Sequence, residues 1–114
     1  MTAPRRSELY WVQLDPAIGS EIARTRPALI ISNDTGNQYA DRVIVAPISS
    51  RSLQKIYPFE VRLNTGEGGL ERDSKVLLDQ IRTLDKSRLG NRIGILTTER
   101  MEEVNRAIRI SLAV

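Results

Sequence analysis

Residues 28–32 read Ala-Leu-Ile-Ile-Ser, an apolar run that directly follows a proline at position 27. A strand that is buried on one face alternates apolar and polar residues, whereas this run is apolar at successive positions. We therefore expect a strand that is covered on both faces, either centrally in a barrel or beneath a helix. Pro27 favours an extended conformation for Arg26, the residue before it, at the start of this strand.

Other short segments with strand character surround this run. Period-2 alternation predicts a strand at residues 8–14, and apolar runs predict further strands at residues 42–48, 59–63, 75–83 and 93–96. A proline at position 47 indicates an edge or a bulge in the strand at 42–48.

The segments between these strands are polar and rich in turn-forming residues. Residues 17–26 and 49–57 are expected as loops, the second of them mobile, and residues 33–37 as a turn. Residues 85–89 predict a short helix that ends at Gly90 and Asn91. Thr98 is expected to cap a last helix, whose apolar stripe has four members: Met101, Val104, Ile108 and Leu112.

Many short strands followed by one helix predict a single domain that spans residues 1–114. We expect mainly β structure with α, in the form of a small SH3-like β-barrel with a C-terminal helix.

The composition restricts the chemistry that is open to this chain. Its 114 residues include no His and no Cys, which excludes Ser-His-Asp catalysis, a paired-histidine mechanism, a Cys nucleophile and nearly every transition-metal site. Catalysis must therefore come from carboxylates, hydroxyls, arginine and lysine, and we expect no metal and no cofactor. The net charge of +3 is compatible with a polyanionic partner. No apolar run approaches the ~20 residues of a membrane span, and no export signal follows Met1, so a cytoplasmic protein is expected.

Three stretches closely resemble the motifs of the MazF/PemK family of toxin endoribonucleases from type II toxin-antitoxin systems: residues 19–21 with 26–34, residues 45–50, and residues 79–89. The resemblance runs from about residue 9 to the C-terminus and includes the turn at 69–74. It implies a homodimeric SH3-like barrel that cleaves single-stranded RNA at short sequences. It also implies cleavage without a metal ion, 2′,3′-cyclic phosphate and 5′-hydroxyl ends, and neutralisation by a cognate MazE-like antitoxin.

The catalytic pair that matches the family is Arg26 and Ser49, where the commoner pattern has threonine at the second position. Attack of a ribose 2′-oxygen on phosphorus builds negative charge on the non-bridging oxygens, and a guanidinium offers permanently charged donors to receive it. The Ser49 hydroxyl can donate one hydrogen bond to a phosphate oxygen. Because serine lacks the β-branch that stiffens χ1, we expect this hydroxyl to be less preorganised than that of threonine.

The proton acceptor must lie elsewhere, because Arg26 is protonated at neutral pH. Glu21 is the nearest carboxylate in the sequence, and it is either a candidate base or a group that reads a base edge or a hydroxyl.

Six further side chains are candidates for substrate binding. Asn33 and Gln80 are amides at or near strand ends, match family positions that contact RNA, and can hydrogen-bond to base edges. Four basic residues would contact phosphates around them: Arg24, Arg51, Lys55 and Arg82.

Two other functions stay open at this point. Toxins that resemble CcdB share the barrel and poison DNA gyrase as protein ligands, but they depend on a C-terminal tripeptide of Trp-Gly-Ile type, and this chain ends Ser-Leu-Ala-Val. A non-catalytic RNA-binding barrel is the third possibility, which a cleavage assay distinguishes. Only 4% of the residues are aromatic, so hydrogen bonds and phosphate contacts should dominate over ring stacking.

Overall fold

The computed structural model describes residues 2–114. Its elements follow in the order β1 (Glu8–Gln13), β2 (Thr25–Ile30), α1 (Asp34–Tyr39), β3 (Arg42–Ser49), β4 (Glu60–Leu63), the 3₁₀ turn η1 (Glu67–Gly69), β5 (Ser74–Leu77), β6 (Arg82–Asp85), the 3₁₀ turn η2 (Lys86–Arg88), β7 (Leu89–Ile95) and α2 (Thr98–Leu112).

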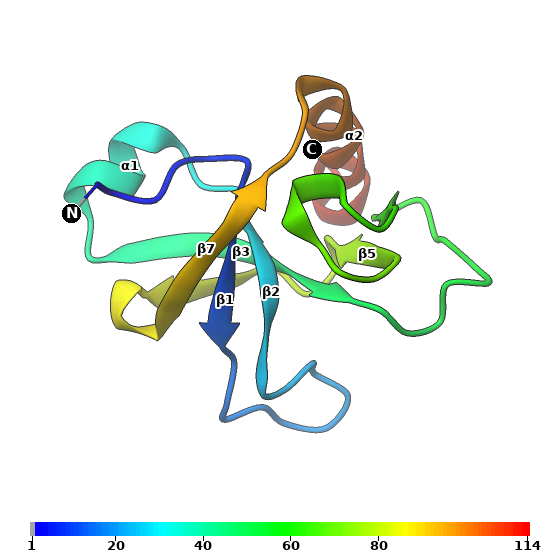
Figure 1. The fold of residues 1–114 in the computed structure, drawn as a ribbon, viewed down its shortest axis with the longest axis horizontal. Coiled ribbons are helices and arrows are strands. Elements are labelled where there is room, and N and C mark those ends of the chain that lie inside the picture. Colours follow the sequence, from blue (N-terminus) through cyan, green and yellow to red (C-terminus); the bar gives the residue numbers. More distant parts are fainter. Residues whose placement is uncertain (1) are drawn as a thin grey trace.

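The strands form one antiparallel sheet whose order is β4-β5-β3-β2-β1-β7, with β6 paired to β3 (Figure 1). Helix α2 packs at one end of the sheet, beside β4. Among the described residues no pairing joins the end strands β4 and β7, so the sheet is barrel-like but open. Mainly β structure with a C-terminal helix is therefore confirmed. No helix within residues 2–114 is long and apolar enough to cross a membrane.

The central strand β2 has an apolar cluster on each of its faces. Leu29 packs in a cluster that includes residues of α2, whereas Ala28 and Ile30 pack in a second cluster with residues of β1, β3 and β6. All three side chains have 0% of their surface exposed. This confirms the prediction of a strand covered on both faces, although the strand begins at Thr25 and ends at Ile30.

The prediction of one strand at residues 75–83 is wrong, because the chain forms β5 and β6 with a turn at 78–81 between them. Both strands pair with β3, which is long enough to hold β6 along its first half and β5 at its end. Pro47 is paired with β2 on one edge of β3, and on the other edge it lies between the part paired with β6 and the part paired with β5. A proline is tolerated in this central strand because the ladder is interrupted on that second edge.

Two helix starts also differ from the prediction. The expected turn at 33–37 is the start of α1, because the Asn33 side chain accepts a hydrogen bond from the Gly36 N–H at 2.7 Å and caps the helix. Helix α2 is capped by Thr97 and not by Thr98.

Other boundaries shift as well. Residues 86–88 form a 3₁₀ turn, and β7 already begins at Leu89. Of the predicted stripe on α2, Leu112 is 56% exposed, while Ala107 is buried.

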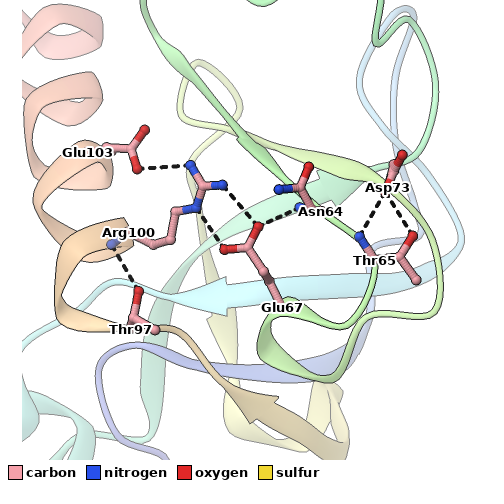
Figure 2. A network of polar contacts seen from close by, with 7 residues as sticks. All are labelled: Asn64, Thr65, Glu67, Asp73, Thr97, Arg100 and Glu103. Carbon is pink, nitrogen blue, oxygen red and sulfur yellow. Dashed lines mark hydrogen bonds and ion pairs between the residues drawn. The ribbon is translucent and has the colours of Figure 1, made fainter.

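An ion-pair network joins α2 to η1 (Figure 2). Arg100 donates from Nε to Glu67 Oε1 at 2.8 Å and from Nη2 to Glu67 Oε2 at 3.0 Å, and its Nη1 donates to Glu103 at 2.9 Å. The hydrogen bond from Arg100 lowers the pKa of the Glu67 carboxyl below its usual value. The network holds η1 against the end of the sheet, where Gly69 helps to line a cavity.

Candidate active site

The start of β2 lies beside the end of β3. The antiparallel register pairs Ala28 with Pro47, and continuing it by two residues places Arg26 opposite Ser49. The two residues that the sequence nominated as a catalytic pair therefore lie at adjoining ends of neighbouring strands, two residues beyond the last paired positions.

The Arg26 side chain is partly buried and turned toward the loop that precedes it. Its Nε–H donates to the backbone oxygen of Ala23 at 3.0 Å. A guanidinium has five N–H donors, so this bond fixes the orientation of the plane and uses only one of them. The side chain can still offer paired donors to a phosphate.

Ser49 is 8% exposed, and its hydroxyl is oriented by the backbone. Its Oγ accepts a hydrogen bond from the Arg51 N–H at 3.1 Å. Because a lone pair is occupied in this way, the O–H remains free to donate toward a ligand. The backbone thus orients the Ser49 hydroxyl through a contact that the difference between serine and threonine side chains does not reveal.

A cavity of about 400 Å³ lies between the loop before β2 and the turn between β5 and β6. Glu21, Gln80 and Arg82 all line it. Gln80 Oε1 accepts from the Ile22 N–H at 2.8 Å, which leaves the NH₂ end of that amide for a ligand. Arg82 Nη1 donates to the Leu14 oxygen at 2.6 Å. The structure therefore brings three predicted site residues together, next to the loop to which the Arg26 side chain is hydrogen-bonded.

A second cavity, of about 320 Å³, lies against β1, β2 and the η1 turn. Arg26 lines it together with Trp11, Ser50 and Arg72. Trp11 is 43% exposed, so an aromatic surface borders this cavity. Arg26 therefore belongs to this second cavity, while its bond to Ala23 ties it to the loop that borders the first.

Four other predicted residues line neither of these cavities. Asn33 caps α1 at the opposite end of β2, about 20 Å from Arg26 by the rise of an extended chain. Arg24 is exposed, with its backbone N–H bonded to Asp15 at 3.0 Å. Arg51 and Lys55 are exposed on the segment between β3 and β4.

Sequence reasoning missed two residues beneath that segment. Residues 49–57 were expected to form a mobile loop, but backbone groups of this loop are bonded to the buried side chains of Lys75 and Glu60. The available signal was a lysine inside an otherwise apolar strand, because a lysine at such a position needs a partner.

Comparison with known proteins shows which family this chain resembles. A family described as "PemK-like, MazF-like toxin of type II toxin-antitoxin system" matches residues 5–112. The chain is 46% identical over 110 residues to endoribonuclease MazF of Staphylococcus saprophyticus, and the match covers 96% of this chain and 92% of that protein.

Solved structures agree in fold. The structure of MazF from Deinococcus radiodurans is 30% identical and has a TM-score of 0.85, with 100% of both chains covered. A mycobacterial endoribonuclease in complex with its cognate antitoxin is 26% identical, with a TM-score of 0.82 over 98% of this chain and 97% of that chain. Together with the sequence match, these findings establish that the chain belongs to the PemK-like, MazF-like toxins of type II toxin-antitoxin systems.

Proposed function

We propose that this endoribonuclease toxin cleaves single-stranded RNA at short sequences without a metal ion, leaving 2′,3′-cyclic phosphate and 5′-hydroxyl ends. The observation that carries the proposal is the register of β2 and β3, which, continued beyond Ala28 and Pro47, sets Arg26 opposite Ser49. The loop to which Arg26 donates also carries Ile22, whose N–H bonds to Gln80 in the cavity lined by Glu21. The absence of His and Cys from the sequence supports a mechanism that uses arginine, hydroxyl and carboxylate groups.

In the proposed mechanism the ribose 2′-oxygen attacks the adjacent phosphorus, the bond from phosphorus to the 5′-oxygen breaks, and the 5′-oxygen takes up a proton from water to become the 5′-hydroxyl. Arg26 donates from its guanidinium to the non-bridging oxygens as their negative charge grows. The Ser49 hydroxyl donates a hydrogen bond to one of the same oxygens. The hydrogen bonds to Ala23 and from Arg51 hold both donors in place before RNA arrives, so less reorganisation is needed in the transition state.

Glu21 is the proposed acceptor of the 2′-hydroxyl proton. Its Oε1 accepts from the Ile18 N–H at 3.2 Å, which orients the carboxylate within its loop. The side chain lines the same cavity as Gln80 and is exposed to solvent. In the alternative role, the same carboxylate accepts hydrogen bonds from a base edge.

RNA is held by amide and basic groups around this centre. The NH₂ of Gln80 reads a base edge, and four basic residues contact phosphates: Arg24, Arg51, Lys55 and Arg82. An RNA that also reaches Asn33 on the same chain must run the length of β2. Phosphate contacts of this kind make the affinity fall as the salt concentration rises.

The proposed partners are a second copy of this chain and a MazE-like antitoxin in the cytoplasm. The support for an antitoxin is the family itself, together with the mycobacterial relative that was solved with its cognate antitoxin. An acidic, partly disordered antitoxin tail that covers the basic site and folds on binding would block access of RNA.

The test is incubation of the purified protein with a long single-stranded RNA in EDTA, followed by mapping of the fragment ends. We expect discrete fragments with 5′-hydroxyl and 2′,3′-cyclic phosphate ends. Arg26→Ala should abolish cleavage, a loss of at least about a thousandfold, because it removes the charged donor to the phosphate. Its circular dichroism spectrum, melting temperature and oligomeric state should match the wild type.

Arg106→Ala is the matched control, since it removes an exposed arginine from α2 and should cleave like the wild type. RNA that stays intact with wild-type protein would indicate a non-catalytic RNA-binding barrel. Cleavage that stops in EDTA contradicts metal independence, and wild-type rates in Arg26→Ala contradict the assigned role of that residue.

A further inference from the structure

A buried ion pair lies beneath the loop that connects β3 to β4. The Nζ of Lys75 on β5 is 3.0 Å from Oε1 of Glu60 on β4, and each side chain has only 6% of its surface exposed. Burial of two charges is costly unless close geometry and further hydrogen bonds satisfy both groups. The burial of both charges in this pair therefore needs an explanation in terms of the groups around it.

The pair projects from the face of the sheet on which Ser49 lies. Lys75 is paired with Ser49 of β3 on one side and with Arg62 of β4 on the other. Val76, the next residue, projects from the opposite face into the apolar core. The loop between β3 and β4 lies over Lys75 and Glu60, and this cover accounts for their burial.

The pair bonds to the backbone of this loop at three positions. The Lys75 ammonium donates to the oxygen of Ser52 at 3.0 Å and to that of Lys55 at 3.4 Å, as well as to Glu60. Glu60 Oε1 also accepts from the Tyr57 N–H at 3.0 Å. An ammonium has three N–H donors, so every donor of Lys75 has a partner.

We propose that Lys75 is a positioning residue that holds the loop between β3 and β4 in the conformation that binds RNA. This inference rests on the proposed function, because the loop carries Arg51 and Lys55, two of the proposed phosphate contacts. A loop that is ordered in advance lowers the entropy that RNA binding must overcome. Arg26 and Ser49 lie on β2 and β3 themselves, and the Arg51 N–H that orients Ser49 precedes the first loop position that Lys75 holds, so loss of the Lys75 contacts raises KM and leaves kcat almost unchanged.

The first test replaces both charges, with Lys75→Met and Glu60→Gln in one variant. No unpaired charge is then buried, and the glutamine amide oxygen can still accept from Tyr57, so the variant isolates the contacts of the ammonium. We expect KM for an RNA substrate to rise about tenfold and kcat to change less than about twofold. Amide hydrogen exchange should become faster in residues 52–58 and stay unchanged at Arg51 and in β2.

A chemical rescue separates positioning from general damage. The natural sequence has no cysteine, so Lys75→Cys places a single thiol in the chain. The variant is unfolded, alkylated with 2-bromoethylamine to restore an ammonium on a side chain of nearly the same length, and refolded. We expect KM to return to near the wild-type value, whereas alkylation with neutral iodoacetamide should leave it raised.

The matched control removes another ion pair, that of Arg92 Nε with Glu8 Oε2 at 2.6 Å, through Arg92→Gln with Glu8→Gln. These residues lie away from the loop, so stability should fall with KM unchanged. If the wild-type protein cleaves no RNA, the proposed function fails, while hydrogen exchange still reports on the loop. If the wild type cleaves and the Lys75 variant keeps either its KM or its protection at residues 52–58, the positioning role is wrong.

Discussion

The Ser49 hydroxyl shows how backbone geometry can replace a feature of the side chain. Threonine restricts its own χ1 through the β-branch, and serine does not. Here the Arg51 N–H occupies a lone pair of Ser49 Oγ, and only 8% of the residue is exposed. The hydroxyl is therefore held by its neighbours, which reduces the disadvantage of serine at this position.

We predict that Ser49→Ala slows RNA cleavage about a hundredfold, since one donor to the phosphate is lost. Ser49→Thr should be equal to or faster than the wild type, because the hydroxyl is kept and the β-branch adds restriction. Single-turnover rates with saturating protein measure both effects without interference from binding. A threonine variant slower than the wild type would contradict the argument from preorganisation.

At the scale of elements, the N-terminal end of α2 is joined to η1 by an ion pair. Arg100 bridges Glu67 on η1 and Glu103 on its own helix, and Glu67 Oε2 also accepts from the Asn64 N–H at 2.6 Å (Figure 2). The same bonds raise the pKa of Arg100 and lower that of Glu67. Gly94 on β7 lies so close to η1 that an added Cβ would sit 2.3 Å from the Gly68 oxygen, so the turn is fixed on both sides.

The lowered pKa of Glu67 predicts a pH-dependent contribution to stability. A carboxyl whose pKa is depressed by folding stabilises the protein above its unfolded-state pKa of about 4.3, and this contribution is lost as the pH falls through the folded-state pKa. Glu67→Gln should therefore lower the free energy of unfolding by about 1 kcal/mol at neutral pH. The difference from wild type should shrink below about pH 4.

Urea unfolding at a series of pH values measures this difference. Glu102→Gln, which removes an exposed carboxyl from α2, is the control for net charge and should change stability little at any pH. A difference between Glu67→Gln and wild type that stays constant down to acid pH would show that the ion pair is not its source.

At the scale of the whole molecule, β2 separates two apolar clusters that the same chain builds. Leu29 belongs to the cluster that includes α2, and Ile30 belongs to the cluster between β1, β3 and β6. Since adjacent residues of one strand join the clusters, neither can come apart without disturbing the other. We propose on this basis that residues 1–114 unfold as one domain.

We predict that Leu29→Ala and Ile30→Ala each lower the free energy of unfolding by about 3 kcal/mol, because each removes a fully buried side chain. Both variants should keep a single transition. Fluorescence of Trp11 on β1 and far-ultraviolet circular dichroism, which reports on α2, should give coincident unfolding curves. Curves that separate for either variant would contradict a single cooperative unit.

The sequence alone was sufficient for features that depend on local patterns. Residues 28–32 indicated a strand buried on both faces, and most strands, the last helix and the family motifs around Arg26 and Ser49 were also readable. These features are local because apolar periodicity reports which faces are buried, and turn residues report where an element ends. The absence of His and Cys restricted the chemistry independently of any fold.

The tertiary structure decided which elements meet. The segment at 75–83 divides into two strands because β3 offers each a different part of its edge, and the turn between them brings Gln80 to the loop before β2. Lys75 has its ion-pair partner, Glu60, on a strand that precedes it in the chain. Such contacts join positions far apart in sequence, and a pattern within one segment reports that a side chain is buried but not what it meets there.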